Sequence, residues 1–140
     1  MIFCVDVKSV QEIVELKSAL EKVMEERPKI QGFSAPQLKW NKRAFVIRRK
    51  GVITFMANPR ILWKFGHIKS NEGCESIKGR YVVKRPFIMQ VEYMDDRGNT
   101  IRKTVLYKKA RIICHEIDHL NNITIRDVGK IWWGSKYVRE

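Results

Sequence analysis

Two histidines four residues apart are the strongest chemical signal in this sequence. His115 and His119 lie in a stretch of the pattern H-E-x-x-H. On a helix, residues four apart share one face, so both imidazoles can reach a single metal ion. Glu116 follows the first histidine and is placed to exchange protons with water at the metal. The third histidine, His67, is assigned no function.

A catalytic metal commonly has three protein ligands, so this pair needs one more. Zinc proteases with this pattern take it from downstream, where the acidic residues are Asp127 and Glu140. Upstream, Cys74 lies in the polar, glycine-marked stretch 71–76. Its polar neighbours argue against a cysteine that only fills apolar space. The sequence therefore favours a Cys-His-His set.

Length and composition limit the class of protein. A chain of 140 residues predicts one domain over 1–140, and its 44% hydrophobic and 31% charged residues are typical of a globular protein. No apolar run approaches a membrane span, and residues 1–8 lack the pattern of a secretory signal or transit peptide. With 3 cysteines and no framework spacing, we expect a cytoplasmic protein without a membrane partner.

The net charge of +13 is spread along the chain rather than gathered in one arm. There is no zinc-finger spacing and no glycine-aromatic signature of an RNA-binding module. Such a spread favours weak, salt-sensitive attraction to polyanions. A basic surface that is merely solvated explains it equally well.

Periodicity predicts two main helices. Residues 10–27 repeat apolar side chains at helical spacing, with a Ser9–Glu12 capping box before them and Pro28 after them. The second helix, 106–121, carries both histidines of the motif. Strands are predicted at 2–7, 43–48, 52–57, 61–69, 80–84, 87–94 and 100–105, loops at 30–37, 71–76 and 95–99, and a short strand with a packed tail after residue 121.

Three segments in this order resemble the motifs of the peptide deformylase family. That family has a glycine loop G-x-G-x-A-A-x-Q, then E-G-C-x-S, then H-E-x-D-H. The corresponding segments here are 30–37, 72–76 and 115–119. The resemblance covers roughly residues 10–127. It implies an α+β fold, in which antiparallel sheets pack around a central metal-binding helix, with an N-terminal helix.

The resemblance implies a hydrolase that removes the formyl group from formyl-methionyl nascent peptides. It implies Cys74, His115 and His119 as metal ligands and Glu116, Gln37 and Glu75 as catalytic residues. The metal is typically iron(II), with zinc, nickel or cobalt as alternatives. Glu116 would transfer protons, while the side-chain amide of Gln37 and the backbone N–H of Glu75 would stabilise the oxyanion.

The same resemblance places the substrate. The backbone of Gln31 and Gly32 would pair with an extended peptide. The methionine pocket would be lined by Gln31, Ser70, Lys108, Arg111 and Ile112, and Gly73 and Arg80 would also contact substrate. This pocket is more polar than is usual in the family, so we expect weaker discrimination against less hydrophobic first residues.

Glu72 and Asp118 are implied as residues that orient the metal ligands. Two arginines, Arg80 and Arg85, are the candidate partners of Glu72.

The chain departs from the family pattern at four positions, namely Ile30, Ser34, Lys39 and Glu75. None of them is a metal ligand or the catalytic acid. The chain also lacks the long C-terminal helix of many bacterial members, as phage-encoded members do. The implied protein is a monomer in a bacterial cell or phage-infected host, with weak electrostatic attraction to the ribosome.

Three other functions compete with this interpretation. A deformylase-like binding protein without catalysis is disfavoured by the intact Glu116, Gln37 and ligand set. A zinc endopeptidase is disfavoured because Cys74 already completes the metal site. A module that binds nucleic acid or the ribosome is supported only by the net charge.

Overall fold

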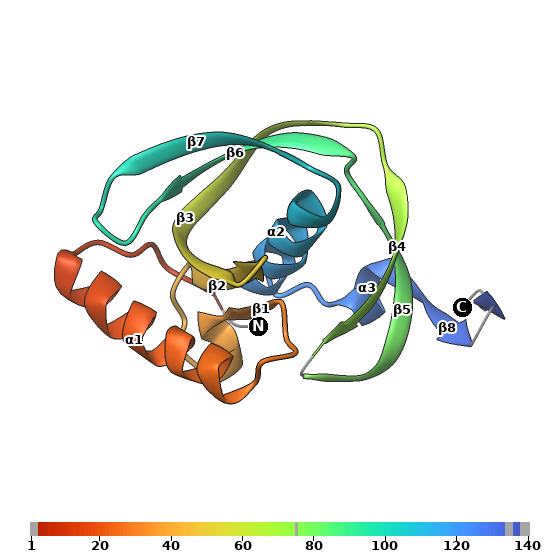
Figure 1. Cartoon of the computed structure of the whole chain (residues 1–140), viewed down its shortest axis with the longest axis horizontal. Helices are drawn as coiled ribbons and strands as arrows, with labels where there is room; N and C mark the ends of the chain where they lie inside the picture. The colour runs from red at the N-terminus through yellow and green to blue at the C-terminus, as the bar shows by residue number, and fades with distance from the viewer. Residues whose placement is uncertain (1–2, 75, 134–135, 138–140) are drawn as a thin grey trace.

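The computed structural model describes residues 3–74, 76–133 and 136–137, with side chains through residue 131. Figure 1 shows two antiparallel sheets with α2 (Tyr107–Leu120) between them. One sheet has the order β1 (Gly32–Ser34), β2 (Ala44–Arg49), β3 (Val52–Phe65), β6 (Ile88–Met94) and β7 (Thr100–Leu106). The other has the order β4 (Ile68–Cys74), β5 (Ile77–Arg85), β8 (Gly129–Trp133) and β9 (Lys136–Tyr137). The predicted α+β class, with its central helix, is confirmed.

The N-terminal helix α1 (Val10–Glu26) forms where its periodicity predicts it. Ser9 Oγ accepts the Glu12 N–H at 3.1 Å, which caps the first turn. The other half of the predicted box differs, because Glu12 Oε1 accepts from Lys8 N–H at 3.0 Å. The buried face of α1 consists of Ile13, Leu16, Leu20 and Met24, and it packs against the side of the larger sheet that carries Val46 and Phe55.

The central helix α2 is held by burial on several sides. Ala110, Ile113 and Ile117 pack against β2 and β6 in the main core, which includes Phe45 and Met89. In Figure 1, β3, β6 and β7 arch over this helix, and β4 and β5 stand at its side. This packing fixes the direction in which the remaining face of α2, with both histidines, can point.

The predicted strand 2–7 was wrong, and so was the break predicted between the strands 52–57 and 61–69. Residues 3–7 form no strand, and Val5 makes only an isolated parallel bridge to Lys42. The predicted strands 52–57 and 61–69 are largely one strand, β3, which runs through Pro59. A register shift between Ala57 and Arg60 accommodates that proline, which has no N–H to donate to the ladder.

Two predicted loops are partly regular structure. Residues 30–37 contain β1 and the short 3-10 helix η1 (Ala35–Leu38), and residues 71–74 are the end of β4. Both segments contain glycine, and the first also contains proline, so their local strand preference is weak. Pairing with β2 and β5 makes them extended. After α2, a short helix α3 (Ile125–Val128) forms that was not predicted. No helix in the described part of the chain could span a membrane.

Candidate active site

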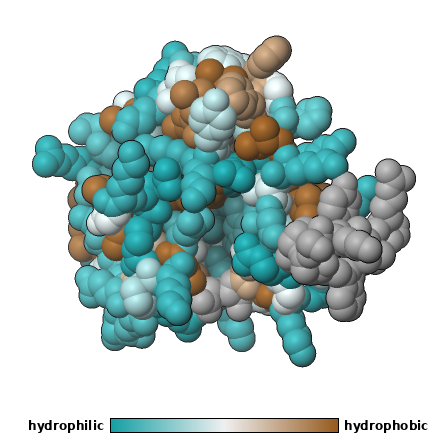
Figure 2. Space-filling model, turned by 45° about the vertical axis from the view of Figure 1, so that its right-hand side comes forward, coloured by the Kyte–Doolittle hydropathy of each residue, from teal (hydrophilic) through white to brown (hydrophobic). Residues whose placement is uncertain are grey.

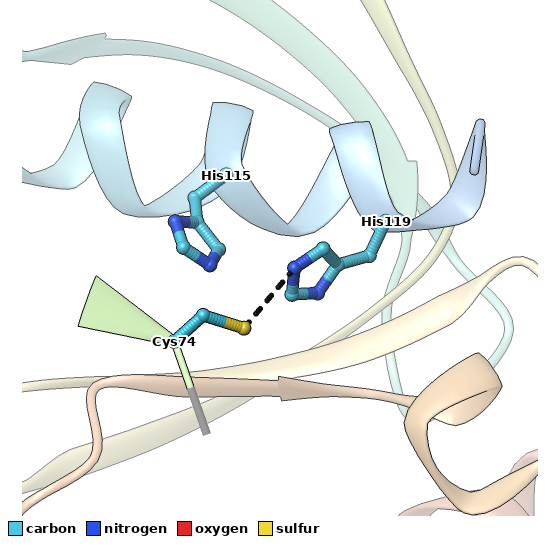
Figure 3. A group of neighbouring side chains, drawn as sticks. All are labelled: Cys74, His115 and His119. Carbon is cyan, nitrogen blue, oxygen red and sulfur yellow. Dashed lines mark hydrogen bonds between the residues drawn. The ribbon is translucent and has the colours of Figure 1, made fainter. Parts of the chain in front are cut away.

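Cys74, His115 and His119 converge on one point, although the cysteine comes from β4 and the histidines from α2 (Figure 3). Their ligand atoms all lie within 4.8 Å of one another. Cys74 Sγ is 3.5 Å from His119 Nε2. Metal–sulfur and metal–nitrogen bonds of about 2.3 and 2.0–2.1 Å at a tetrahedral angle place sulfur and nitrogen about 3.5 Å apart. The donor atoms and spacing therefore fit a metal ion.

The downstream carboxylate of Asp127 does not take the cysteine's place. Asp127 Oδ2 accepts the Thr124 N–H at 2.8 Å and so caps α3. Among the described residues, Asp127 is not part of the cluster of candidate metal ligands. Glu140 lies outside the described residues.

The capping pair Thr124–Asp127 is also the sequence signal by which α3 could have been predicted.

Hydrogen bonds fix which nitrogen of each imidazole faces the site. His115 Nδ1 lies 2.8 Å from Glu72 Oε1, and a carboxylate can only accept, so Nδ1 carries the proton and Nε2 is left as a ligand. His119 Nδ1 lies 3.1 Å from Gln37 Oε1, also an acceptor, and its Nε2 faces Cys74. Both rings are thereby oriented as metal-binding histidines are.

A buried arginine anchors this arrangement. Arg85 donates to both oxygens of Glu72, at 2.9 and 2.8 Å, and to Asp118 Oδ2 at 2.6 Å. Of the two candidate partners of Glu72, the structure selects Arg85, whereas Arg80 donates to Asn71 Oδ1 at 2.8 Å. Burial alone raises the pKa of Glu72, but hydrogen bonds from Arg85 and His115 lower it to about 2.

The pKa values of the three clustered residues are shifted toward a thiolate and protonated imidazoles. Burial raises the pKa of Cys74, but hydrogen bonds with His115 and His119 lower it to about 6. Burial lowers the pKa of His115, but hydrogen bonds with Cys74 and Glu72 raise it to about 10. Burial also lowers the pKa of His119, but hydrogen bonds with Cys74 and Glu116 raise it to about 9. A divalent cation suits the same field.

Glu116 is buried beside the cluster, with its side chain 4% exposed. Its Oε1 has no hydrogen-bond partner among the described residues and lies 3.4 Å from His119 Nδ1. The backbone of Gly32 passes directly over this carboxylate, since a Cβ built on Gly32 would lie 2.7 Å from Glu116 Oε2. The carboxylate is therefore held in place while one oxygen stays available for a proton.

The side-chain amide of Gln37 is oriented by the backbone N–H of Ser34. Gln37 Oε1 accepts the Ser34 N–H at 3.0 Å, and only an oxygen can do so. Gln37 Nε2 then points toward the site, where it donates to Ser76 Oγ at 3.0 Å and lies 4.0 Å from Cys74 Sγ. This is a fixed N–H donor beside the cluster. The backbone N–H of Glu75, the other predicted donor, lies outside the described residues.

A cleft of about 800 Å³ opens over the cluster. It is bordered by β1 and β4, which both lie at the edge of their sheets in the described part of the chain, so an extended peptide could pair with either. All of the residues predicted to bind substrate line this cleft, namely Gln31, Gly32, Gly73, Arg80, Lys108, Arg111 and Ile112.

Residues 3–130 match the sequence model of the family described as polypeptide deformylase. The chain belongs to the peptide deformylase family. It is 31% identical over 127 residues to the peptide deformylase of Caldanaerobacter subterraneus, covering 86% of this chain and 80% of that one. It is 35% identical over 97 residues to that of Alkaliphilus metalliredigens, covering 69% and 66%. The chain thus spans about two thirds of the length of some curated deformylases that it matches.

Solved deformylase structures share the fold. Peptide deformylase from Thermus thermophilus superposes with a TM-score of 0.83 at 31% identity, over 89% of this chain and 75% of that one. A probable peptide deformylase from Synechococcus phage S-SSM7 gives 0.84 at 29% identity, over 91% and 90%. Metal dependence is a general property of the deformylase family, and the Cys-His-His cluster provides a site for it.

Two departures from the deformylase motifs have local explanations. Ser34 is buried, and its hydroxyl lies 2.9 Å from Gln37 Oε1 and 3.3 Å from His119 Nδ1, so it adds a contact that alanine lacks. Lys39 has a φ of 62°, a left-handed conformation that glycine adopts without strain, so the backbone at this position favours glycine over lysine. Ser34 was not predicted as a site residue, and its only sequence signal is the substitution itself.

Replacing Gly32 by alanine is expected to impair the site without unfolding the protein. The backbone at Gly32 has no positive φ, so alanine is not strained there. The new methyl group must instead push Glu116 aside by several tenths of an ångström, and a 1 Å misplacement can reduce a rate about a hundredfold. We expect a loss of about ten- to a hundredfold in turnover with an unchanged melting temperature. Equal loss of stability and activity would contradict this.

Proposed function

We propose that this chain hydrolyses the formyl group from N-formyl-methionyl peptides and releases formate. The observation that carries the proposal is the Cys74-His115-His119 cluster with Glu116 beside it, in a chain of the deformylase family. We further propose that residues 1–140 act as one catalytic domain, as a monomer in the cytoplasm of a bacterial cell or phage-infected host.

In this proposal, the three clustered residues bind the metal and Glu116 transfers protons. Cys74, His115 and His119 would hold a divalent metal, which supplies an activated water and a Lewis acid for the formyl carbonyl. Glu116 removes a proton from the attacking water and delivers it to the departing amine. Its buried Oε1, which has no hydrogen-bond partner among the described residues, suits this transfer.

The remaining residues stabilise charge and position the peptide. Gln37 Nε2 donates to the oxygen that becomes negative, and Ser34 fixes the direction of that donor. The backbone N–H of Glu75 is proposed as a second donor. Gln31 and Gly32 at one edge of the cleft, and Gly73 at the other, pair with the extended peptide and hold its formyl end at the cluster.

Formate release from formyl-Met-Ala-Ser tests this function directly. The apoprotein would be reconstituted under argon with iron(II), cobalt, nickel or zinc, all of which a thiolate and two imidazoles can bind. We propose iron(II) as the physiological ion and expect the fastest turnover with it. In air, iron and the Cys74 thiolate are open to oxidation, so activity should decay with iron(II) and persist with nickel or cobalt.

Two outcomes would overturn these proposals separately. Absence of formate release with all four metals would reject the deformylase activity. Equal activity with zinc and iron(II), together with an iron form that is stable in air, would reject the proposed metal and leave the activity in place.

Charge supports a second proposal, which concerns the ribosome. The net charge is +13, and Figure 2 shows one face of the molecule that is mainly hydrophilic, with a group of apolar side chains near its top. We propose that diffuse positive charge brings the protein to the polyanionic ribosome. Co-sedimentation with ribosomes should fall steeply between about 50 and 200 mM salt, as expected for release of counterions. Binding that does not change with salt, or no binding at the lowest salt, would contradict this.

A further inference from the structure

The cleft has an unusually polar wall on one side of the metal-ligand cluster. Arg111 and Lys108 precede His115 on α2 by four and seven residues, so they lie on the same helix face and line the cleft. Ser70 of β4 lies across from Arg111, and Gln31 lines the same cleft. Ile112 is the apolar member of this group. One to two helical turns separate this wall from the cluster, about the length of one long side chain.

Arg111 has unused hydrogen-bonding capacity. Its Nε is buried and has no hydrogen-bond partner among the described residues. Its Nη1 makes only a long contact of 3.5 Å with Ser70 Oγ, and Ser70 is 3% exposed. A buried guanidinium nitrogen without a partner is costly, and a ligand that brings an acceptor removes that cost.

Among the described residues, the side chains around this wall carry positive charge without an ion-pair partner. In the described part of the chain, neither Lys108 nor Arg111 forms an ion pair. Among the described residues, the carboxylates that line the cleft are Glu72, which is paired with Arg85, and Glu116 at the cluster. Lys108 also lies in the first turn of α2, which has no acidic residue and no side-chain cap, so the positive end of the helix dipole adds to the field.

We propose that this wall binds a first side chain that ends in a hydrogen-bond acceptor, best of all a carboxylate, with Arg111 as the specificity-determining residue. This inference rests on the proposed function, because the formyl group at the cluster places the first side chain along α2. Formyl-methionyl peptides remain substrates, and formyl peptides whose first residue has the length of methionine and a polar end should be used at least as well. Glutamate and glutamine meet that description, and norleucine is the apolar control of the same length.

The test compares kcat/KM for formyl-Glu-Ala-Ser, formyl-Gln-Ala-Ser and formyl-Nle-Ala-Ser in three proteins, namely the unchanged chain, Arg111→Leu and Arg102→Leu. We expect the unchanged chain to use the glutamate peptide at least as well as the norleucine peptide. Arg111→Leu should lower the glutamate-to-norleucine ratio by tenfold or more, since hydrogen bonds to charged groups are worth about 1.5–3 kcal/mol. Arg102 lies on β7, is exposed and pairs with Glu92, so Arg102→Leu should leave the ratio unchanged.

The glutamine peptide separates charge from hydrogen bonding. Suppose that the glutamate preference shrinks with added salt, that glutamine remains favoured over norleucine, and that Arg111→Leu removes both preferences. Both effects are then assigned to Arg111. A clear norleucine preference in the unchanged chain, or a ratio that Arg111→Leu does not change, would overturn the inference while formate release still supports the deformylase function.

A binding measurement keeps the inference testable if turnover is absent. The same three formyl peptides are titrated calorimetrically into the Glu116→Gln protein and into the double variant that also carries Arg111→Leu. This measurement needs no catalysis. Tighter binding of the glutamate peptide that depends on Arg111 would support the polar pocket even without formate release. Equal binding of all three peptides would reject it.

Discussion

The Glu116→Gln protein should retain its metal and lose formate release by on the order of a hundredfold or more, the usual size of a general acid–base effect. Glutamine has the same shape, and Glu116 is not one of the three clustered ligands, so metal content should be unchanged. Its Oε1 is buried and has no hydrogen-bond partner among the described residues, so a neutral amide there removes the proton acceptor without breaking a described hydrogen bond on that atom. The measurement is kcat/KM for formyl-Met-Ala-Ser with metal content determined on the same sample.

Glu25→Gln is a suitable control, because it makes the same chemical change at an exposed position of α1. It should leave both turnover and metal content unaltered. Near-normal formate release from Glu116→Gln would show that another group transfers the proton. Loss of metal in that variant would show instead that the carboxylate supports the ligands.

The Arg85→Met protein should be destabilised by about 3–5 kcal/mol, because it leaves two buried or half-buried carboxylates without their counter-charge. Arg85 is 4% exposed and makes three hydrogen bonds, two to Glu72 and one to Asp118. The exposed Arg102, which pairs with Glu92, is the matched control, and Arg102→Met should change stability by less than about 1 kcal/mol. Urea unfolding at pH 7 measures both.

The effect of Arg85→Met should depend on pH in a defined direction. The folded-state pKa of Glu72 is lowered from 4.5 to about 2, so its pairing adds stability above pH 4.5 and loses it as the pH falls toward 2. The difference in free energy of unfolding between the unchanged protein and Arg85→Met should therefore be largest at neutral pH. It should shrink as the pH falls from 4.5 toward 2. An Arg85→Met protein that is as stable as Arg102→Met at pH 7 would contradict the role assigned to this network.

Helix-level features could be read from the sequence because their causes are local. The spacing of His115 and His119 places both rings on one face of any helix, whatever surrounds it. The apolar period of α1 and the side chain of Ser9 are likewise sufficient to define that helix and its start. The three family motifs then indicated Cys74 as third ligand, and the structure brings its sulfur to the histidines.

Tertiary contacts decided the rest. Residues 71–74 lack strand propensity, and they are extended because β5 supplies hydrogen bonds to them. Pairing with β6 likewise carries β3 through Pro59, where the local signal predicted an end. Long-range pairing of this kind depends on the partner strand, which no local window contains.

The choice of Arg85 rather than Arg80 as the partner of Glu72 was also made by the fold. The two arginines are alternatives in the sequence, but only Arg85 is buried between β4 and α2, whereas Arg80 turns to Asn71. The approach of Gly32 to Glu116 is of the same kind, because it joins the edge of a sheet to the face of a helix. The sequence by itself determined which reactive side chains this protein has. Packing between distant segments determined which neighbouring atoms position those side chains.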